Sequence, residues 1–128
     1  MKRHFISSCA LVIMALGACK TNDNTTTTPV PTDSVVVLSG DITTDITIVK
    51  GKKYLLKGFV FVKSGATMNI EKGSVIMGDK ASKGTLVITR GATINAVGTA
   101  SEPIVFTSAI AAGGRREGDW GGLIILGK

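Results

Sequence analysis

The apolar residues after position 34 come in short runs rather than in long amphipathic segments. Each run has three or four residues, is rich in β-branched and aromatic side chains, and is bounded by Gly, Asp, Ser or Lys. This pattern is typical of β-strands. No segment of this region repeats apolar residues at helical spacing for two turns, so the pattern predicts an all-β domain. The runs are Val35–Leu38, Ile46–Val49, Tyr54–Leu56, Phe59–Val62, Val75–Met77, Leu86–Ile88, Ile104–Phe106 and Leu123–Leu126.

One stretch of the chain repeats itself. Residues 57–69 (KGFVFVKSGATMN) align with residues 83–95 (KGTLVITRGATIN) at a constant offset of 26, with six identities in thirteen positions. Further along, Val75–Met77 corresponds to Ile104–Phe106 at an offset of 29, and a third copy begins at Gly122, 38 residues after Gly84. A self-similar unit of this length indicates a stacked repeat architecture.

Each copy divides into three short strands separated by bends, which is one coil of a parallel β-helix. Like residues then stack from coil to coil and bury columns of Val, Ile and Leu that no single coil could bury. Because side chains alternate along a strand, every second residue should point into the coil. The expected inward residues are Val60, Val62, Leu86 and Ile88, and the expected outward charged pair at equivalent positions is Lys63 and Arg90.

The bends repeat as well as the strands. Gly65 and Gly91 are expected to supply the bend conformation, since only glycine takes a positive φ without steric cost. Asn69 and Asn95 recur at the same step of the two copies. This recurrence allows either a side-chain amide ladder or two independently solvated amides.

The first 18 residues are predicted to be a targeting signal. Met1-Lys2-Arg3 is cationic, and the 14 residues from Phe5 to Ala18 carry no charge. As a helix they would span about 21 Å, short of the ~30 Å hydrocarbon core of a bilayer, which favours a secretory signal over a membrane span. Leu16-Gly17-Ala18-Cys19 resembles the lipobox of bacterial lipoproteins, in which the cysteine becomes the acylated N-terminal residue. The alternative is an ordinary signal peptide with a chance cysteine.

Removal of the signal changes the chemistry that the chain can offer. The sequence has 15 Lys+Arg and 9 Asp+Glu, and loss of Lys2 and Arg3 leaves 13 against 9, or +4. His4 and Cys9 leave with the signal, and Cys19 would be blocked by acylation. The remaining chain would have no histidine and no free thiol, which excludes a Ser–His–Asp triad, a Cys–His pair, a zinc finger and a disulfide framework. Its modest, scattered charge predicts no nucleic-acid partner.

Composition divides the chain into four segments. Residues 20–34 contain Val30 as their one apolar residue apart from proline, and cannot bury enough surface to offset the entropy of ordering. The predicted segments are a lipoprotein signal peptide at 1–18, a disordered Thr/Pro-rich tether at 19–34, N-terminal capping strands at 35–56, and β-helix coils at 57–128.

Three runs of the coil region resemble a known family. They are residues 84–92 (GTLVITRGA), 98–108 (GTASEPIVFTS) and 118–127 (GDWGGLIILG). They are similar to the right-handed β-helix region of cell-surface lipoproteins and secreted repeat proteins from Bacteroidetes, and the Gly-Asp-Trp-Gly-Gly step is the most specific part. The resemblance covers about residues 54–128. It implies a fold and a cellular location, but no particular reaction.

The fold that the resemblance implies is a right-handed parallel β-helix. Members of that family normally run on for several hundred residues, so we expect this chain to be an N-terminal fragment. It should hold about two to three coils that are incomplete at the C-terminal end. The implied location is the bacterial cell envelope, as an outer membrane lipoprotein on the periplasmic or the surface-exposed face.

The densest polar cluster is Arg115-Arg116-Glu117-Gly118-Asp119-Trp120, on the loop that enters the third copy. In a saccharide site, Trp120 would stack on a sugar ring, the arginines would pair with uronate or sulfate, and the carboxylates would serve as acid and base. In a structured turn, Trp120 would pack over the coil edge and Asp119 would bind turn amides. Calcium needs six to eight oxygen ligands, and no three acidic residues cluster, so we expect no metal and no cofactor.

These observations favour a non-catalytic, lipid-anchored β-helix protein of the envelope or surface. Its role would be surface display, adhesion or glycan contact. It would be held to the membrane through Cys19, with a glycan or an envelope protein as its partner. The alternative is a fragment of a carbohydrate-active enzyme, a polysaccharide lyase or hydrolase, with the same fold. An immunoglobulin-like sandwich would fit the strand density but not the 26-residue internal copy.

Overall fold

A computed structural model describes residues 34–127 of the protein, and this part contains β-strands and no helix. All strand pairs are parallel. The strands are β1 (Val35–Ile42), β2 (Ile46–Ile48), β3 (Lys53–Val62), β4 (Thr67–Ile70), β5 (Val75–Gly78), β6 (Thr85–Ile88), β7 (Thr93–Ala96), β8 (Val105–Ser108) and β9 (Gly122–Ile125).

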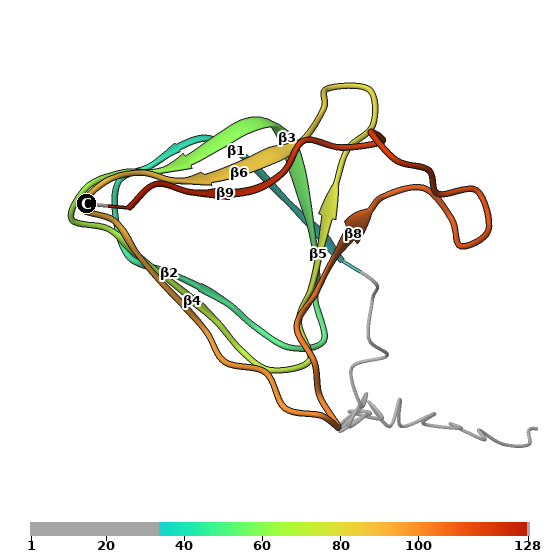
Figure 1. Ribbon diagram of the computed structural model, residues 1–128. Coiled ribbons are helices and arrows are strands. Elements are labelled where there is room, and N and C mark those ends of the chain that lie inside the picture. The colour runs from blue at the N-terminus through green and yellow to red at the C-terminus, as the bar shows by residue number, and fades with distance from the viewer. Residues whose placement is uncertain (1–33, 128) are drawn as a thin grey trace, which may run out of the picture.

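The chain winds around one axis and has a triangular cross-section (Figure 1). The first side holds the beginning of β1, the beginning of β3, β5 and β8. The second side holds the end of β1, the end of β3, β6 and β9. The third side holds β2, β4 and β7. The expected parallel β-helix is therefore confirmed.

Two strands turn a corner of the triangle without interruption. In β3, residues 53–56 pair with β5, and residues 59–62 pair with β6. In β1, the register against β3 shifts between Ser39 and Gly40, where the chain passes the same corner. The first and second sides therefore belong to one continuous sheet, and the third side is a separate sheet.

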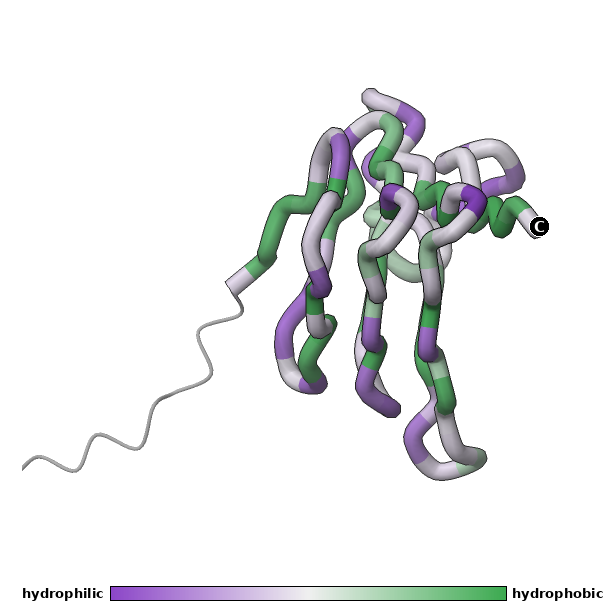
Figure 2. Tube along the Cα trace, turned by 90° about the vertical axis from the view of Figure 1, so that its left-hand side faces the viewer, coloured by the Kyte–Doolittle hydropathy of each residue, from purple (hydrophilic) through white to green (hydrophobic). Residues whose placement is uncertain are grey.

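Successive coils stack side by side along the axis (Figure 2). The described part holds three complete coils, at 35–48, 53–70 and 75–96, and two sides of a fourth, at 105–108 and 122–125. The 35–48 segment, which we expected among the capping strands, itself winds as a coil in parallel register with β3 and β4. The expected boundary at residue 56 falls inside β3.

The structure corrects two of the predicted alignments by one residue. Val75 pairs with Val105, an offset of 30 rather than 29, and Gly122 pairs with Thr85 rather than with Gly84. A one-residue slip would turn every side chain of a strand to the opposite face. The error arose because these strands are separated by loops of unequal length, and short apolar runs alone cannot place such insertions.

The interior is a set of aliphatic columns, as predicted. Val60 and Val62 are fully buried, and they pair with Leu86 and Ile88, whose exposed fractions are 1% and 2%. Each coil contributes one such layer of inward-pointing side chains to the interior. In the described residues, every buried side-chain nitrogen and oxygen has a hydrogen-bond partner.

The bend between the second and third sides depends on glycine, also as predicted. Gly65 and Gly91 have φ values of 87° and 78°, and the Gly65 amide donates to the Gly91 carbonyl at 2.9 Å. A Cβ at position 91 would lie 2.4 Å from Ser64 Oγ. Gly91 is thus required both by backbone conformation and by the close approach of the neighbouring coil.

The outer surface is polar on the third side and apolar on the other two. Thr47, Asn69 and Asn95 share one outward row of the third side. On the first side Val37 is 52% exposed, and on the second side Phe59 is 59% exposed. The third side is therefore the face that offers hydrogen-bonding groups to a ligand.

We predict that Leu56→Ala lowers the free energy of unfolding by about 2–5 kcal/mol, because it removes a fully buried side chain and leaves a cavity. Urea denaturation followed by circular dichroism measures the change. The matched control is Leu126→Ala, at a side chain that is 46% exposed, with an expected change of about 0.5 kcal/mol or less. Equal losses in the two variants would contradict the proposed interior.

Candidate functional site

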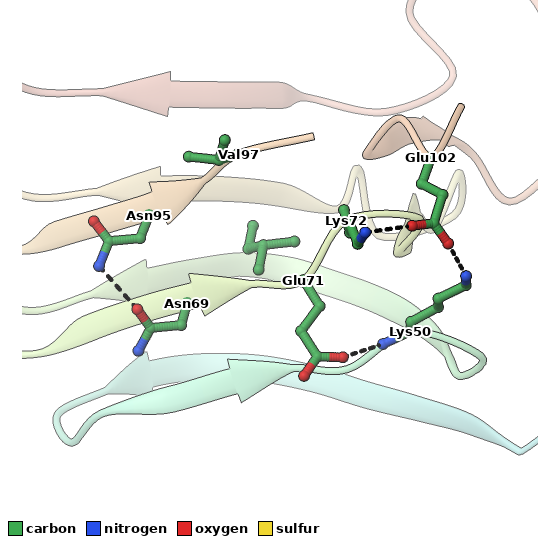
Figure 3. A pocket seen from close by; sticks show the side chains of 8 residues that line it. Lys50, Asn69, Glu71, Lys72, Asn95, Val97 and Glu102 are labelled. Atoms are coloured by element: carbon green, nitrogen blue, oxygen red, sulfur yellow. Dashed lines mark hydrogen bonds and ion pairs between the residues drawn. The ribbon is translucent and has the colours of Figure 1, made fainter. Parts of the chain in front are cut away.

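A groove lies on the third side, where the chain leaves that side and turns the corner toward the first (Figure 3). Its volume is about 520 Å³. Three consecutive coils contribute to it, since its residues lie after β2, within and after β4, and within and after β7. The lining residues are Lys50, Asn69, Ile70, Glu71, Lys72, Asn95, Val97 and Glu102.

Glu102 connects the charged residues of this groove. One carboxylate oxygen binds Lys50 Nζ, and the other lies 2.8 Å from Lys72 Nζ. The Glu71 carboxylate accepts a hydrogen bond of 2.9 Å from the Lys50 amide. Because Lys50, Lys72 and Glu102 follow strands of three different coils, these contacts tie the coils together across the groove (Figure 3).

Glu102 is placed by a tight turn in the loop between β7 and β8. Its amide donates to Thr99 Oγ1 at 3.0 Å, and its carbonyl accepts from the amides of Thr99 and Gly73 at 3.2 and 3.1 Å. The loop is thereby fixed to the preceding coil. The side chain of Glu102 is 25% exposed.

The ion pairs determine the charge state of the groove. The hydrogen bond from Lys50, followed by that from Lys72, lowers the pKa of Glu102 from 4.5 to about 2. The hydrogen bond to Glu102 raises the pKa of Lys72 above its ordinary value of 10.5. Both groups are therefore ionised at neutral pH, and Glu102 cannot donate a proton as a general acid there.

The remaining wall of the groove is formed by amides and an aliphatic side chain. Asn95 Nδ2 donates to Asn69 Oδ1 at 2.8 Å, so of the two arrangements considered from the sequence, the amide ladder is confirmed. Val97 stands at the rim with 81% of its surface exposed (Figure 3). The groove therefore combines neutralised charges, amide groups and an apolar contact.

The sequence did not indicate this groove. Lys50 and Lys72 are equivalent, because Ile48 pairs with Ile70, but they lie outside the aligned copies at 57–69 and 83–95. We predicted that Lys63 and Arg90 occupy equivalent positions, and this prediction was wrong. Val62 pairs with Ile88, so the partner of Lys63 is Thr89. Lys50, Lys72 and Glu102 lie in corners of unequal length, which no constant offset aligns.

The Arg115–Trp120 loop is organised by Asp119. This carboxylate is 2% exposed, and its Oδ1 lies 2.9 Å from Lys80 Nζ. Its Oδ2 accepts hydrogen bonds from the Arg116 amide at 2.9 Å and from Ser108 Oγ at 3.1 Å. These interactions, with the Arg116 amide as the largest contribution, lower the pKa of Asp119.

Trp120 packs against the coil at the place where the loop returns to it. It is partly buried against the core, and a Cβ on Gly78 would lie 2.4 Å from Trp120 Cβ. Both the packing of Trp120 and the turn amide bound by Asp119 agree with the structured-turn interpretation of this cluster.

A second, smaller hollow of about 340 Å³ lies beside this loop. Four of the five predicted contact residues line it, and Asp119 does not. Arg115 Nε donates to the Ile110 carbonyl at 2.8 Å. Arg116 and Glu117 are exposed at the surface. The lining residues are Phe106, Thr107, Ser108, Arg115, Arg116, Glu117 and Trp120.

Residues 34–127 contain no group of three or more His, Cys, Asp or Glu side chains that could hold a metal ion. They also contain no helix long and apolar enough to cross a membrane. The predicted lipidation site, Cys19, lies outside the described residues, and so do His4 and Cys9.

Comparison with protein families agrees with this architecture. A family model described as a pectate-lyase-like β-helix domain matches residues 40–128, which is more than half of the chain. The chain therefore belongs to the family of proteins with this β-helix domain. The family assignment is compatible with a carbohydrate-active protein. No curated protein and no solved structure matches the chain.

We predict that the Glu102 ion pairs make stability dependent on acid pH. Because the folded pKa is lowered, this stabilisation is present above about pH 4.5 and is lost as the pH falls toward 2. Thermal melts across this range should show a steeper loss for the wild type than for Glu102→Gln. Glu117→Gln, at an exposed loop carboxylate, is the control and should follow the wild type. Parallel curves for Glu102→Gln and wild type would refute the prediction.

We also predict that Asp119→Ala loosens the loop at 109–121, because the Arg116 amide, the Ser108 hydroxyl and Lys80 lose their shared partner. Limited proteolysis should cut this loop several-fold faster, and the melting temperature should fall. Glu117→Ala serves as the matched control on the same loop and should leave both measurements unchanged. Unaltered proteolysis of Asp119→Ala would show that other contacts hold the loop.

Proposed function

We propose that this protein is a non-catalytic glycan-binding β-helix, held at the bacterial envelope by a lipid anchor on Cys19. The observation that carries the glycan-binding part is the groove across three coils. Its charged side chains are tied to one another, and its amides form a ladder on an exposed face. Such a preformed groove binds an extended ligand with little loss of side-chain entropy.

The protonation states of the carboxylates support binding rather than hydrolysis. A glycoside hydrolase needs one carboxylic acid with a raised pKa to protonate the leaving oxygen. The pKa of Glu102 is lowered to about 2, and the pKa of Asp119 is also lowered, by the hydrogen bonds and ion pairs described above. Neither group is suited to that role at neutral pH.

The alternative function is catalysis, as a fragment of a polysaccharide lyase or hydrolase. It is favoured by the family match and by the hollow next to Trp120. There Arg116 and Glu117 are exposed and lie beside an aromatic side chain. An acidic sugar could pair with the arginine there, as the sequence suggested.

Affinity electrophoresis of the purified full chain in gels containing polysaccharides tests the proposal. Retention of the protein without new reducing ends or unsaturated products in the incubated polymer is the expected result. Depolymerisation would overturn the proposal in favour of the alternative. Absence of retention by every neutral and acidic polymer tested would also overturn it.

The lipid anchor yields a separate prediction. The N-terminal peptide of the mature chain should begin at Cys19 and carry the mass of several acyl chains, which give durable anchoring where a single chain does not. Cys19→Ala should move the protein from the detergent-extracted membrane fraction to the soluble fraction. Cys9→Ala is the control and should leave the fractionation unchanged. An unacylated N-terminus in the wild type would refute the anchor.

A further inference from the structure

We infer that the ligand of the groove on the third side is an uncharged polysaccharide segment that lies across the coils. This inference rests on the proposed glycan binding and adds the class of ligand and its direction. It follows from three features of the groove: its charge balance, the amide atoms that the ladder leaves available for hydrogen bonds, and its exposed apolar rim.

The charge balance argues against an acidic ligand. Two lysines and two glutamates line the groove, so its formal charge is zero. Glu102 binds both lysine side chains, so each ammonium already has a carboxylate partner that offsets its charge. A groove of zero formal charge offers a polyanion no net electrostatic attraction, while a neutral chain needs none.

The amide ladder offers the groups that hydroxyls need. With Asn95 Nδ2 bound to Asn69 Oδ1, no hydrogen bond within residues 34–127 occupies Asn69 Nδ2 or Asn95 Oδ1. One is a donor and the other an acceptor, and a sugar hydroxyl can serve both roles. The two side chains are repeated from one coil to the next, at the spacing of adjacent strands, about 4.8 Å. A ligand that uses both amides therefore bridges two adjacent coils.

The apolar rim completes the site. Val97 directly follows β7 and exposes 81% of its surface at the edge of the groove (Figure 3). An exposed aliphatic side chain gains from covering the C–H face of a sugar ring, which also carries no charge. The same rim offers nothing to a carboxylate or a sulfate.

Affinity electrophoresis with two neutral polymers, a β-glucan and dextran, and two acidic polymers, polygalacturonate and heparin, tests the inference on the full chain. We expect retention by at least one neutral polymer, and equal retention at low salt and at about 1 M salt, where charges are screened within about 3 Å. Retention by acidic polymers alone would overturn the inference and leave glycan binding intact. No retention by any polymer would overturn both.

Variants locate the binding in the groove. Asn69→Ala/Asn95→Ala should weaken retention by a neutral polymer about tenfold, as expected for the loss of two hydrogen bonds. The matched control, Thr67→Ala/Thr93→Ala, changes a register pair on the same two strands that does not line the groove, and should bind like the wild type. Equal binding by the asparagine variant and the control would overturn the inference.

A third variant tests the charge argument independently of the amides. Glu102→Gln leaves two lysines against one glutamate, so the groove gains a charge of +1. Retention by polygalacturonate should then rise above that of the wild type and fall again at high salt. An unchanged preference for neutral polymers in a variant that melts cooperatively would show that Glu102 does not exclude acidic ligands.

Discussion

The structure depends on the parallel register between successive coils. Val60 lies over Leu86, and Leu86 lies over Leu123, because backbone hydrogen bonds fix which residues face each other. The same register places like side chains in columns, so each inward residue is covered by those of its neighbouring coils. Ile125 shows the reverse case. It continues the column of Val62 and Ile88, but no described coil follows it, and it is 59% exposed.

This constraint explains why the candidate site lies at a corner. Side chains of strand residues point either into the interior or out from a sheet face. The corners vary in length, so they can bring together residues that are far apart in the sequence. Lys50 and Lys72 occupy equivalent corner positions, and the longer loop after β7 lets Glu102 reach back between them. The resulting ion pairs both join the coils and set the charge of the groove.

The groove on the third side and the hollow beside Trp120, both within residues 34–127, differ in chemistry. In the groove on the third side, cations and carboxylates neutralise one another, and amides and an aliphatic rim remain available. In the hollow beside Trp120, the buried Asp119 is used to hold the loop, and Arg116 and Glu117 remain exposed. The first offers hydrogen-bonding groups without unbalanced charge, which is the basis for proposing a neutral glycan there.

The sequence by itself determined the fold class, the glycine bends and the equivalence of Asn69 and Asn95, since all three follow from a constant offset of 26 within which each residue has a direct counterpart. That the two amides are hydrogen-bonded to each other was decided by the tertiary structure. It also located the Arg115–Trp120 cluster, but both interpretations of that cluster fitted its composition. Only the tertiary structure decided that Asp119 is buried and that Glu102 joins Lys50 and Lys72. Those contacts cross corners of unequal length, and register across such corners is set by hydrogen bonding between coils rather than by any local pattern.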